Sequence, residues 1–527
     1  MRKMKRNILI IAMMAAVSAG IFSGCKKSQF DDRYYDPEKT TLANIDGLYS
    51  GLFKNRRVIP NYWNLYTFIA PQTSKYAQSL GFANTNRMYE QTVNYTQDRW
   101  NDFYTAPGSN FSGPIASFRE MERLYNALKT DAEKQGYLLF METARIFVYD
   151  QATQMVDLWG DIPFTDAGKL NATGGELILA KYDKGKDVYD LALTDLKRIS
   201  DYLATVQPDQ FYQNKLIKQD FILKGNLVAW RKYCNSLLLR LAMRISYQDE
   251  AKAQGIVQTL LSNPTKYPLI ETVSENVQIA AKGPDLLSTD MRDGLGGNLA
   301  PGYMLDSLMK PSGDPRLRVF FAKNKSGGYF GVPLSWDGGR QSDSISSGFI
   351  SRIDSVTFIN NVNFPGIILT AAEVSFSKAE AYERWGGGDA KAAYENGIKQ
   401  SISYYFNING LSAWGTPAQA ATAAEISALL TSPQVAYGTV GKDDNLNKIG
   451  LQKWVDYGVM LSPQAWAEMR RSGYPRLFFP KDVGTTTMPT PPLRLLYPDK
   501  ERTLNADNFK AVAAQDGAYN KIFWQVR

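Results

Sequence analysis

The sequence predicts a mainly α-helical protein built from amphipathic helices and helical hairpins, with a loop-rich insertion. Three observations predict this class. Residues 225–247 carry one continuous apolar stripe with the spacing of an α-helix. Residues 370–405 contain two amphipathic segments that three consecutive glycines separate. Residues from about 271 to 365 are instead rich in Gly, Ser, Asn and Pro and show little helical periodicity.

The stretch 225–247 is predicted to be a central scaffold helix. Its stripe consists of Leu227, Trp230, Cys234, Leu237, Leu241 and Ile245. A helix this apolar must pack between other elements. Cys234 lies on the stripe without a basic partner that would lower its pKa, which indicates a small buried hydrophobe and not a nucleophile. Long basic side chains mark the edge that reaches water or a carboxylate: Arg231, Lys232, Arg240 and Arg244.

Residues 370–405 are predicted to form an antiparallel helical hairpin. The segment Thr370-Ala371-Ala372-Glu373 has the capping-box pattern and opens a helix that runs to Trp385. Gly386-Gly387-Gly388 ends this helix, and Asp389 can cap a second helix that continues through Ile402. Such a hairpin is the unit of a tetratricopeptide-type array. Because strict 34-residue repeats are not visible, we expect an irregular array.

Composition excludes several classes of function. The 527 residues are 44% hydrophobic and 12% aromatic, enough for a large core. Four of the 60 basic residues lie in the first six positions. The rest of the chain has 56 basic against 52 acidic residues, which gives no reason to expect nucleic-acid binding. There is no histidine, so Ser-His-Asp and Cys-His catalysis are excluded. With two cysteines and no phosphate-binding glycine loop, we expect neither a metal site nor a cofactor.

The first 25 residues have the pattern of a bacterial lipoprotein leader. Met1 to Arg6 is basic and Ile8 to Phe22 is apolar. Fifteen helical residues extend about 22 Å, whereas a bilayer core is about 30 Å thick, so a signal peptide over residues 1–24 is favoured over a membrane span. Ser23-Gly24-Cys25 resembles a lipobox and predicts lipidation of Cys25. The alternative is a plain secretory leader followed by a chance cysteine.

A polar segment follows the cysteine. Residues 25–40 are predicted to be a lipidated tether, with a turn at Asp36-Pro37. Residues 41–527 are predicted to form a single domain, with a helical scaffold over about 41–270 and 366–480 and the loop-rich insertion between them.

Short motifs along the chain resemble the SusD/RagB family, which comprises lipid-anchored nutrient-binding proteins of the Bacteroidetes outer membrane. They include the helix from Trp230-Arg231-Lys232 to Arg244, Gly160-Asp161-Ile162-Pro163-Phe164, Tyr182-Asp183, Asp314-Pro315-Arg316-Leu317, Gln452-Lys453-Trp454, Ala465 to Pro475, and Arg494 with Tyr497-Pro498. The segment from Phe30-Asp31-Asp32 to Pro37 departs from the family's commoner Phe-Leu-Asp-x-x-Pro. We interpret this departure as a divergent branch, in which the ligand class stays open and a peptide is an alternative to a sugar.

The resemblance implies a SusD-like domain that captures an oligosaccharide and passes it to a TonB-dependent, SusC-like outer-membrane transporter. It implies a non-catalytic protein that the Cys25 lipid anchors in the outer membrane. In this family, an acidic stretch after the lipidated cysteine accompanies display on the cell exterior, and Asp31 and Asp32 supply such a stretch here, although Lys26 and Lys27 precede them.

The candidate ligand-binding residues lie in two irregular stretches. A glycan site needs aromatic platforms for the C–H faces of sugars beside polar groups for their hydroxyls. Asn61 to Tyr66 and Tyr329 to Arg340 combine these residue types outside any helical stripe. The candidates are Trp63, Tyr66, Tyr329, Trp336, Asp337 and Arg340. The alternative is that these aromatics only anchor their loops, as Trp414 and Trp524 in other irregular segments also can.

Two other functions stay open from the residues alone. A surface glycosidase needs only two carboxylates, and 52 acidic residues always supply some pair at a suitable separation. A lipid-anchored assembly module would use the helical array to bind proteins only.

Overall fold

A computed structural model describes residues 43–107, 113–176, 179–280 and 288–527. Cys25, the predicted leader and the whole of the predicted tether lie outside the described residues. Residues Ile45–Arg527 form one compact unit, to which all contacts below belong. None of the helices in the described ranges is long and apolar enough to cross a membrane.

Helices dominate the described chain, which confirms the predicted fold class. Before the insertion lie α3 (Ile45–Phe53), α4 (Tyr62–Asn64), the π-helix η1 (Leu65–Thr73), α5 (Ser74–Tyr76), α6 (Val93–Tyr104), α7 (Pro114–Asn126), α8 (Asp131–Trp159), α9 (Gly185–Thr205), α10 (Gln210–Gln219), α11 (Leu227–Ile245) and α12 (Glu250–Leu261). After it lie β2 (Gly366–Leu369), α17 (Ala371–Trp385), α18 (Ala390–Gly410), α19 (Ala423–Thr431), α20 (Lys442–Tyr457), α21 (Ser462–Ser472), α22 (Asp499–Leu504), α23 (Ala506–Phe509) and η5 (Ala513–Gln515).

The described residues of the segment predicted to be loop-rich, 271–280 and 288–365, hold only short elements. They are η2 (Val273–Glu275), β1 (Val277–Ile279), α13 (Ser288–Leu295), η3 (Tyr303–Met309), α14 (Lys310–Ser312), α15 (Leu317–Phe320), α16 (Gly338–Ser346) and η4 (Ser355–Ile359). β1 pairs antiparallel with β2 in a two-stranded sheet. This pairing joins the start of the segment to the residues that follow it.

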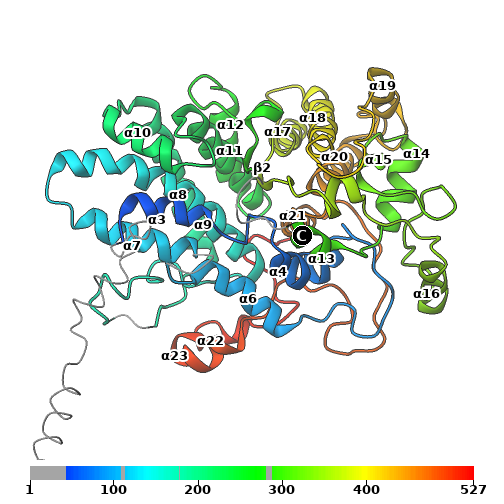
Figure 1. Ribbon diagram of the computed structural model, residues 1–527, viewed down its shortest axis with the longest axis horizontal. Coiled ribbons are helices and arrows are strands. Elements are labelled where there is room, and N and C mark those ends of the chain that lie inside the picture. The colour runs from blue at the N-terminus through cyan, green and yellow to red at the C-terminus, as the bar shows by residue number, and fades with distance from the viewer. Residues whose placement is uncertain (1–42, 108–112, 177–178, 281–287) are drawn as a thin grey trace, which may run out of the picture. The chain divides into compact units, whose positions relative to one another are not determined.

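The scaffold helix predicted from the stripe is α11, which lies among α8, α9, α12 and α17 (Figure 1). Every residue from Tyr233 to Ile245 is buried, because these neighbours cover the helix on several sides. Asn226 caps its first turn by accepting a hydrogen bond from Ala229 N. Cys234 donates to Leu196 O at 3.1 Å, and burial raises the pKa of its thiol. The interpretation of Cys234 as a buried hydrophobe is therefore confirmed.

The predicted hairpin is α17 and α18, which pack along each other beside α20 (Figure 1). Thr370 caps α17 by accepting from Glu373 N at 3.1 Å. The capping box is only half formed, because the Glu373 carboxylate binds Arg240 and does not turn back to the helix start. Gly386 and Gly387 take positive φ angles of 74° and 86° between the two helices, a conformation that suits glycine.

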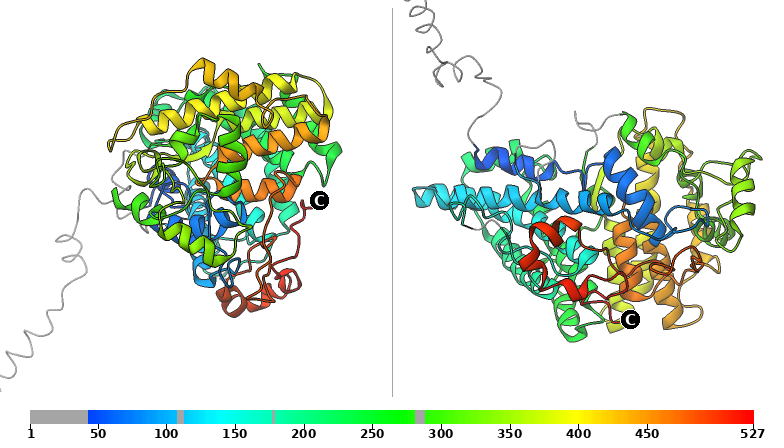
Figure 2. Two further views of the ribbon diagram at one scale, coloured as in Figure 1. Left: turned by 90° about the vertical axis from the view of Figure 1, so that its right-hand side faces the viewer. Right: turned by 90° about the horizontal axis from the view of Figure 1, so that it is seen from below.

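Several of the motifs that resemble the SusD/RagB family meet at the carboxyl end of α8. The C-terminal segment, red in Figures 1 and 2, returns to this point, where Leu495 N donates to Leu158 O at 2.8 Å. Tyr497 donates its hydroxyl to Asp161 O at 2.7 Å, and Arg494 binds Trp159 O. Tyr182 donates to Glu501 at 2.7 Å. These motif residues therefore hold distant parts of the scaffold together.

Buried ion pairs connect the central helices. Arg240 bridges Glu373 on α17, at 2.6 Å, and Asp150 on α8, at 3.1 Å. Arg244 lies 2.7 Å from Glu468 on α21. The sequence predicts that both arginines reach water or a carboxylate, and the structure shows that they reach carboxylates inside the core.

Asp456 on α20 is a buried carboxyl whose ionisation should oppose folding. It accepts a hydrogen bond from Thr370 Oγ1 at 3.0 Å, and burial raises its pKa to about 6. An unfolded aspartate has a pKa of about 3.9. Between about pH 4 and pH 6, Asp456 is therefore protonated in the native state and ionised in the unfolded chain. This group therefore lowers stability as the pH rises from about 4 to 6, and the loss persists above pH 6.

We expect Asp456→Asn to be more stable than the wild type at pH 8, by roughly 1–3 kcal/mol, because the amide keeps an acceptor for Thr370 without a buried charge. The difference should vanish near pH 4, where wild-type Asp456 is protonated when folded. Urea denaturation of both proteins at the two pH values measures this. A variant that loses more stability at pH 8 than at pH 4 would contradict the prediction.

Candidate functional site

Trp63 belongs to a group of four aromatic side chains at the surface. We call Tyr62, Trp63, Tyr66 and Tyr95 the Trp63 cluster. The rings of Tyr62 and Tyr66 stack with centroids 5.3 Å apart and an angle of 19°. Tyr95 on α6 packs edge-on against Trp63, at 6.0 Å, and against Tyr66, at 6.3 Å. Tyr66 is 46% exposed, and the other three rings are partly buried.

Hydrogen bonds fix the position of the Trp63 ring. Asn61 caps α4 by accepting from Trp63 N at 3.0 Å. The indole Nε1 donates to Asp98 on α6 at 2.8 Å. Gly294 on α13 packs so close to the start of η1 that an added Cβ would be 2.6 Å from Leu65 Cβ. The cluster is thus built on packed helices and presents aromatic rings beside a carboxylate, which is the combination that sugars bind.

Trp336 lies in a second group, the Trp336 cluster, made of Phe330, Trp336, Arg340 and Phe349. Phe330 stacks on Trp336 at 5.6 Å and contacts Phe349 at 4.5 Å. The Arg340 guanidinium lies 3.7 Å from the centroid of the Trp336 ring. A sugar could stack on that face only after displacing Arg340, so the arginine now occupies the position that a ligand would take.

Two other candidates near Trp336 have structural roles. Asp337 caps α16 by accepting from Arg340 N at 3.0 Å, and this backbone hydrogen bond lowers the pKa of its carboxyl. Tyr329 packs partly buried against the core, and burial raises its pKa. Asn84 fastens the loop by donating to Trp336 O at 2.9 Å.

The structure does not bring the two predicted stretches together. Figure 1 places α16 at the right edge of the view and α4 near the centre. Sequence reasoning also missed Tyr95 and Phe349. Tyr95 could have been noticed, because it lies off the buried face of α6 formed by Thr96, Arg99, Trp100 and Phe103. No local pattern indicates that Phe349 meets Phe330.

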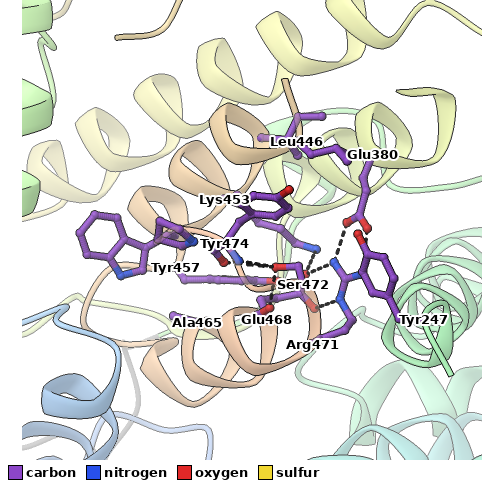
Figure 3. Close-up of a pocket in the computed structure, with 14 residues that line it drawn as sticks. Tyr247, Glu380, Leu446, Lys453, Tyr457, Ala465, Glu468, Arg471, Ser472 and Tyr474 are labelled. Carbon is purple, nitrogen blue, oxygen red and sulfur yellow. Dashed lines mark hydrogen bonds and ion pairs between the residues drawn. The ribbon is translucent and has the colours of Figure 1, made fainter. Parts of the chain in front are cut away.

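A small pocket between α17, α20 and α21 contains two carboxylates (Figure 3). Its volume is about 20 Å³, room for a single water molecule. Arg471 lies between Glu380 and Glu468 and bonds to each, at 2.6 and 2.8 Å (Figure 3). Burial raises the pKa of both carboxyls, but the neighbouring cations together outweigh it and lower the pKa: Arg471 and Arg384 at Glu380, and Arg471, Lys453 and Arg244 at Glu468. A glycosidase acid needs a raised pKa, so this pair does not suit glycoside hydrolysis.

Comparison with known protein families matches residues 48–498 to the SusD-like family described as "Starch-binding associating with outer membrane". The match covers most of the chain. The chain belongs to the SusD-like family. The family's described role is binding, so this protein is a binding protein and not an enzyme. No curated protein sequence matches the chain.

Solved structures show the same fold. A chitin-binding protein is 21% identical with a TM-score of 0.73, over 92% of this chain and all (100%) of that one. A chitin-binding SusD homologue from Flavobacterium johnsoniae is 20% identical with a TM-score of 0.69, over 92% of this chain and 99% of the other. A SusD homologue from Bacteroides fragilis is 19% identical with a TM-score of 0.69, over 92% and 100%.

Proposed function

We propose that this SusD-like protein binds an oligosaccharide on the cell exterior and delivers it to a TonB-dependent, SusC-like transporter. The Trp63 cluster is the observation that carries the binding part of the proposal. The side chain of Tyr66 is nearly half exposed. It lies on η1, most of whose other residues are buried and fix the position of this helix. Exposed aromatic rings on rigid elements are typical of sites that bind the apolar faces of sugars.

The Trp63 cluster is favoured over the Trp336 cluster as the ligand platform. Arg340 covers one face of Trp336, and Asp337 is engaged as a helix cap. Starch in the family description and chitin in two of the relatives suggest maltooligosaccharides and chitooligosaccharides as the first probes. A peptide panel belongs in the same experiment, because the divergent segment after Cys25 leaves the ligand class open.

We expect Tyr66→Ala to weaken binding of the recognised oligosaccharide by about 5- to 30-fold, which corresponds to roughly 1–2 kcal/mol. Trp63→Ala should weaken it as well, and Tyr66→Ala should leave the melting temperature nearly unchanged, since the ring is largely exposed. Titration calorimetry with the sugar found on a glycan panel measures the affinity.

The matched control is Phe211→Ala, which removes a ring that is 60% exposed on α10, far from α4 in Figure 1. It should leave affinity unchanged. If Trp336→Ala abolishes binding and Tyr66→Ala does not, the platform is the Trp336 cluster. Protein binding without any glycan or peptide ligand would support the assembly module.

A transporter partner is the second part of the proposal. A protein that passes its ligand to a channel must stay attached while the ligand moves, so we expect the interface to bury well over about 1,200 Å². Affinity purification from native outer membranes should therefore recover a large β-barrel protein in a one-to-one ratio. Recovery of the tagged protein alone, in mild detergent, would argue against this partner.

A further inference from the structure

An open groove lies between α9 and α12, with α11 as its floor. Both helices pack on α11, whereas they hardly contact each other. The groove has a volume of about 300 Å³ and a mainly apolar lining, which includes Leu193, Leu238, Ala251, Ile256 and Leu260. In Figure 1, α11 and α12 are labelled in the upper part of the view and α4 near its centre, so the groove is separate from the Trp63 cluster.

Gly255 keeps this groove open on the α12 side. It lines the groove, and a Cβ added to it would meet no atom within 4 Å. Glycine inside a helix is less stable than alanine, so a glycine there usually has a packing or functional reason. Gly136 and Gly397 have a packing reason, because an added Cβ would collide with the rings of Tyr212 and Phe376. Packing gives no such reason for Gly255, whose effect is to leave the groove unfilled.

A lysine lies near each end of the groove. Lys252, in the first turn of α12, binds Asp190 on α9 at 2.6 Å. Lys197 follows Asp190 by seven residues on α9, so the two ends lie about 10 Å apart along this helix. Lys197 binds Asp201 at 3.0 Å. Because an ammonium group has three N–H donors, each lysine can bind another acceptor beside its aspartate.

The Lys197 end carries more positive than negative charge. Tyr267 lines the groove there, and the Lys266 ammonium lies 5.2 Å from the centroid of its ring. Asp201 and the Tyr267 hydroxyl both act on Lys197 and raise its pKa. Two lysines thus stand beside one aspartate at this end. None of the ten residues that line the groove is acidic.

The Lys252 end is acidic on balance. Asp190 binds Lys252 and also Lys186. Asp187 and Asp249 add two negative charges, which act on Lys186. Two lysines there stand beside three aspartates, so an anionic group fits the Lys197 end better.

We propose that the groove binds a medium-chain fatty acid, with its alkyl chain along α11 and α12 and its carboxylate at Lys197. An apolar cavity of about 150 Å³ holds one benzene molecule, so about 300 Å³ has room for roughly ten carbon atoms. The length of about 10 Å between the two ends suits a linear chain. Burial of methylenes on the apolar lining stabilises the complex, and the exposed ion pair of Lys197 costs little to share. This site is independent of the glycan platform proposed above.

The first test is titration calorimetry with decanoate on residues 26–527, which contain the whole compact unit and lack the predicted lipid. Decanoate should bind in a one-to-one ratio, and 1-decanol should bind about fivefold more weakly, because it lacks the carboxylate. The absence of saturable decanoate binding, or equal affinities for the two compounds, would overturn the proposal.

Gly255→Leu should weaken decanoate binding about tenfold or more, because leucine fills the groove. The melting temperature should not fall, since the added side chain meets open space and leucine favours a helix. Gln258→Leu is the matched control: it adds the same side chain at an exposed position of α12 that does not line the groove, and it should keep the wild-type affinity. Unchanged affinity in Gly255→Leu, or an equal loss in Gln258→Leu, would contradict the site.

Lys197→Gln should weaken decanoate binding about fivefold, to the affinity of 1-decanol, and should leave the binding of 1-decanol unchanged. Lys252→Gln is its control and should change neither affinity by more than about twofold. Both lysines are partly exposed and form surface ion pairs, so both variants should fold normally. A larger loss of decanoate affinity in Lys252→Gln than in Lys197→Gln would overturn the placement of the carboxylate.

Discussion

Arg471→Met should lower the free energy of unfolding by about 3–5 kcal/mol, because it leaves buried carboxylates without their shared partner. The Arg471 side chain is 1% exposed and binds Glu380 and Glu468 together. Methionine keeps much of the aliphatic packing, so the lost charge dominates the effect. Urea denaturation at pH 7 measures the change.

Arg476→Met is the control for this prediction. Arg476 forms a single exposed ion pair with Asp443, and its side chain is 66% exposed. Exposed pairs contribute about 0–1 kcal/mol, so this variant should stay close to the wild type. Equal losses for the two variants would show that the buried pairs contribute no more than surface ones.

The same ion pairs predict how wild-type stability changes with acid. The pKa values of Glu380 and Glu468 are lowered in the folded protein, below the unfolded value of about 4.3. Their contribution is therefore complete above about pH 5 and is lost as the pH falls through the folded values. The stability of Arg471→Met should depend less on acid, because Arg471 no longer lowers the pKa values of Glu380 and Glu468.

Cys25→Ser should leave the protein unprocessed or detached from the outer membrane. The three acyl chains of a mature bacterial lipoprotein contribute about 0.8 kcal/mol per buried methylene, and the variant lacks this contribution. Palmitate labelling and membrane fractionation measure the result. Cys234→Ser is the control: it changes the only other cysteine, which is buried in α11, and should leave labelling intact. Normal labelling of Cys25→Ser would refute the anchor.

Local patterns carried much of the fold prediction. The stripe from Leu227 to Ile245 matches α11, and the capping residues Thr370 and Asp389 begin α17 and α18. These features depend on residues three or four positions apart, which a sequence displays directly. The family motifs were recognisable for a related reason: Tyr497 and its neighbours hold the scaffold together.

The candidate site depended on contacts that no local pattern contains. Trp524 lies in an irregular segment, yet it is fully buried and donates to Asp157 at 2.9 Å. Trp336 lies in a similar segment, yet its ring is only partly buried and contacts Arg340. Both tryptophans look alike in sequence because burial of a loop residue depends on distant chain that folds over it.

The sequence by itself therefore determined the helical class, the central helix, the hairpin and the family. Only the tertiary structure decided that Arg240 and Arg244 lie inside the core, that Tyr95 joins Trp63, and that α9 and α12 leave a groove over α11. The physical reason is range: helix periodicity and capping act within a few residues, whereas ion pairing, ring packing and cavities depend on how segments far apart in the chain meet.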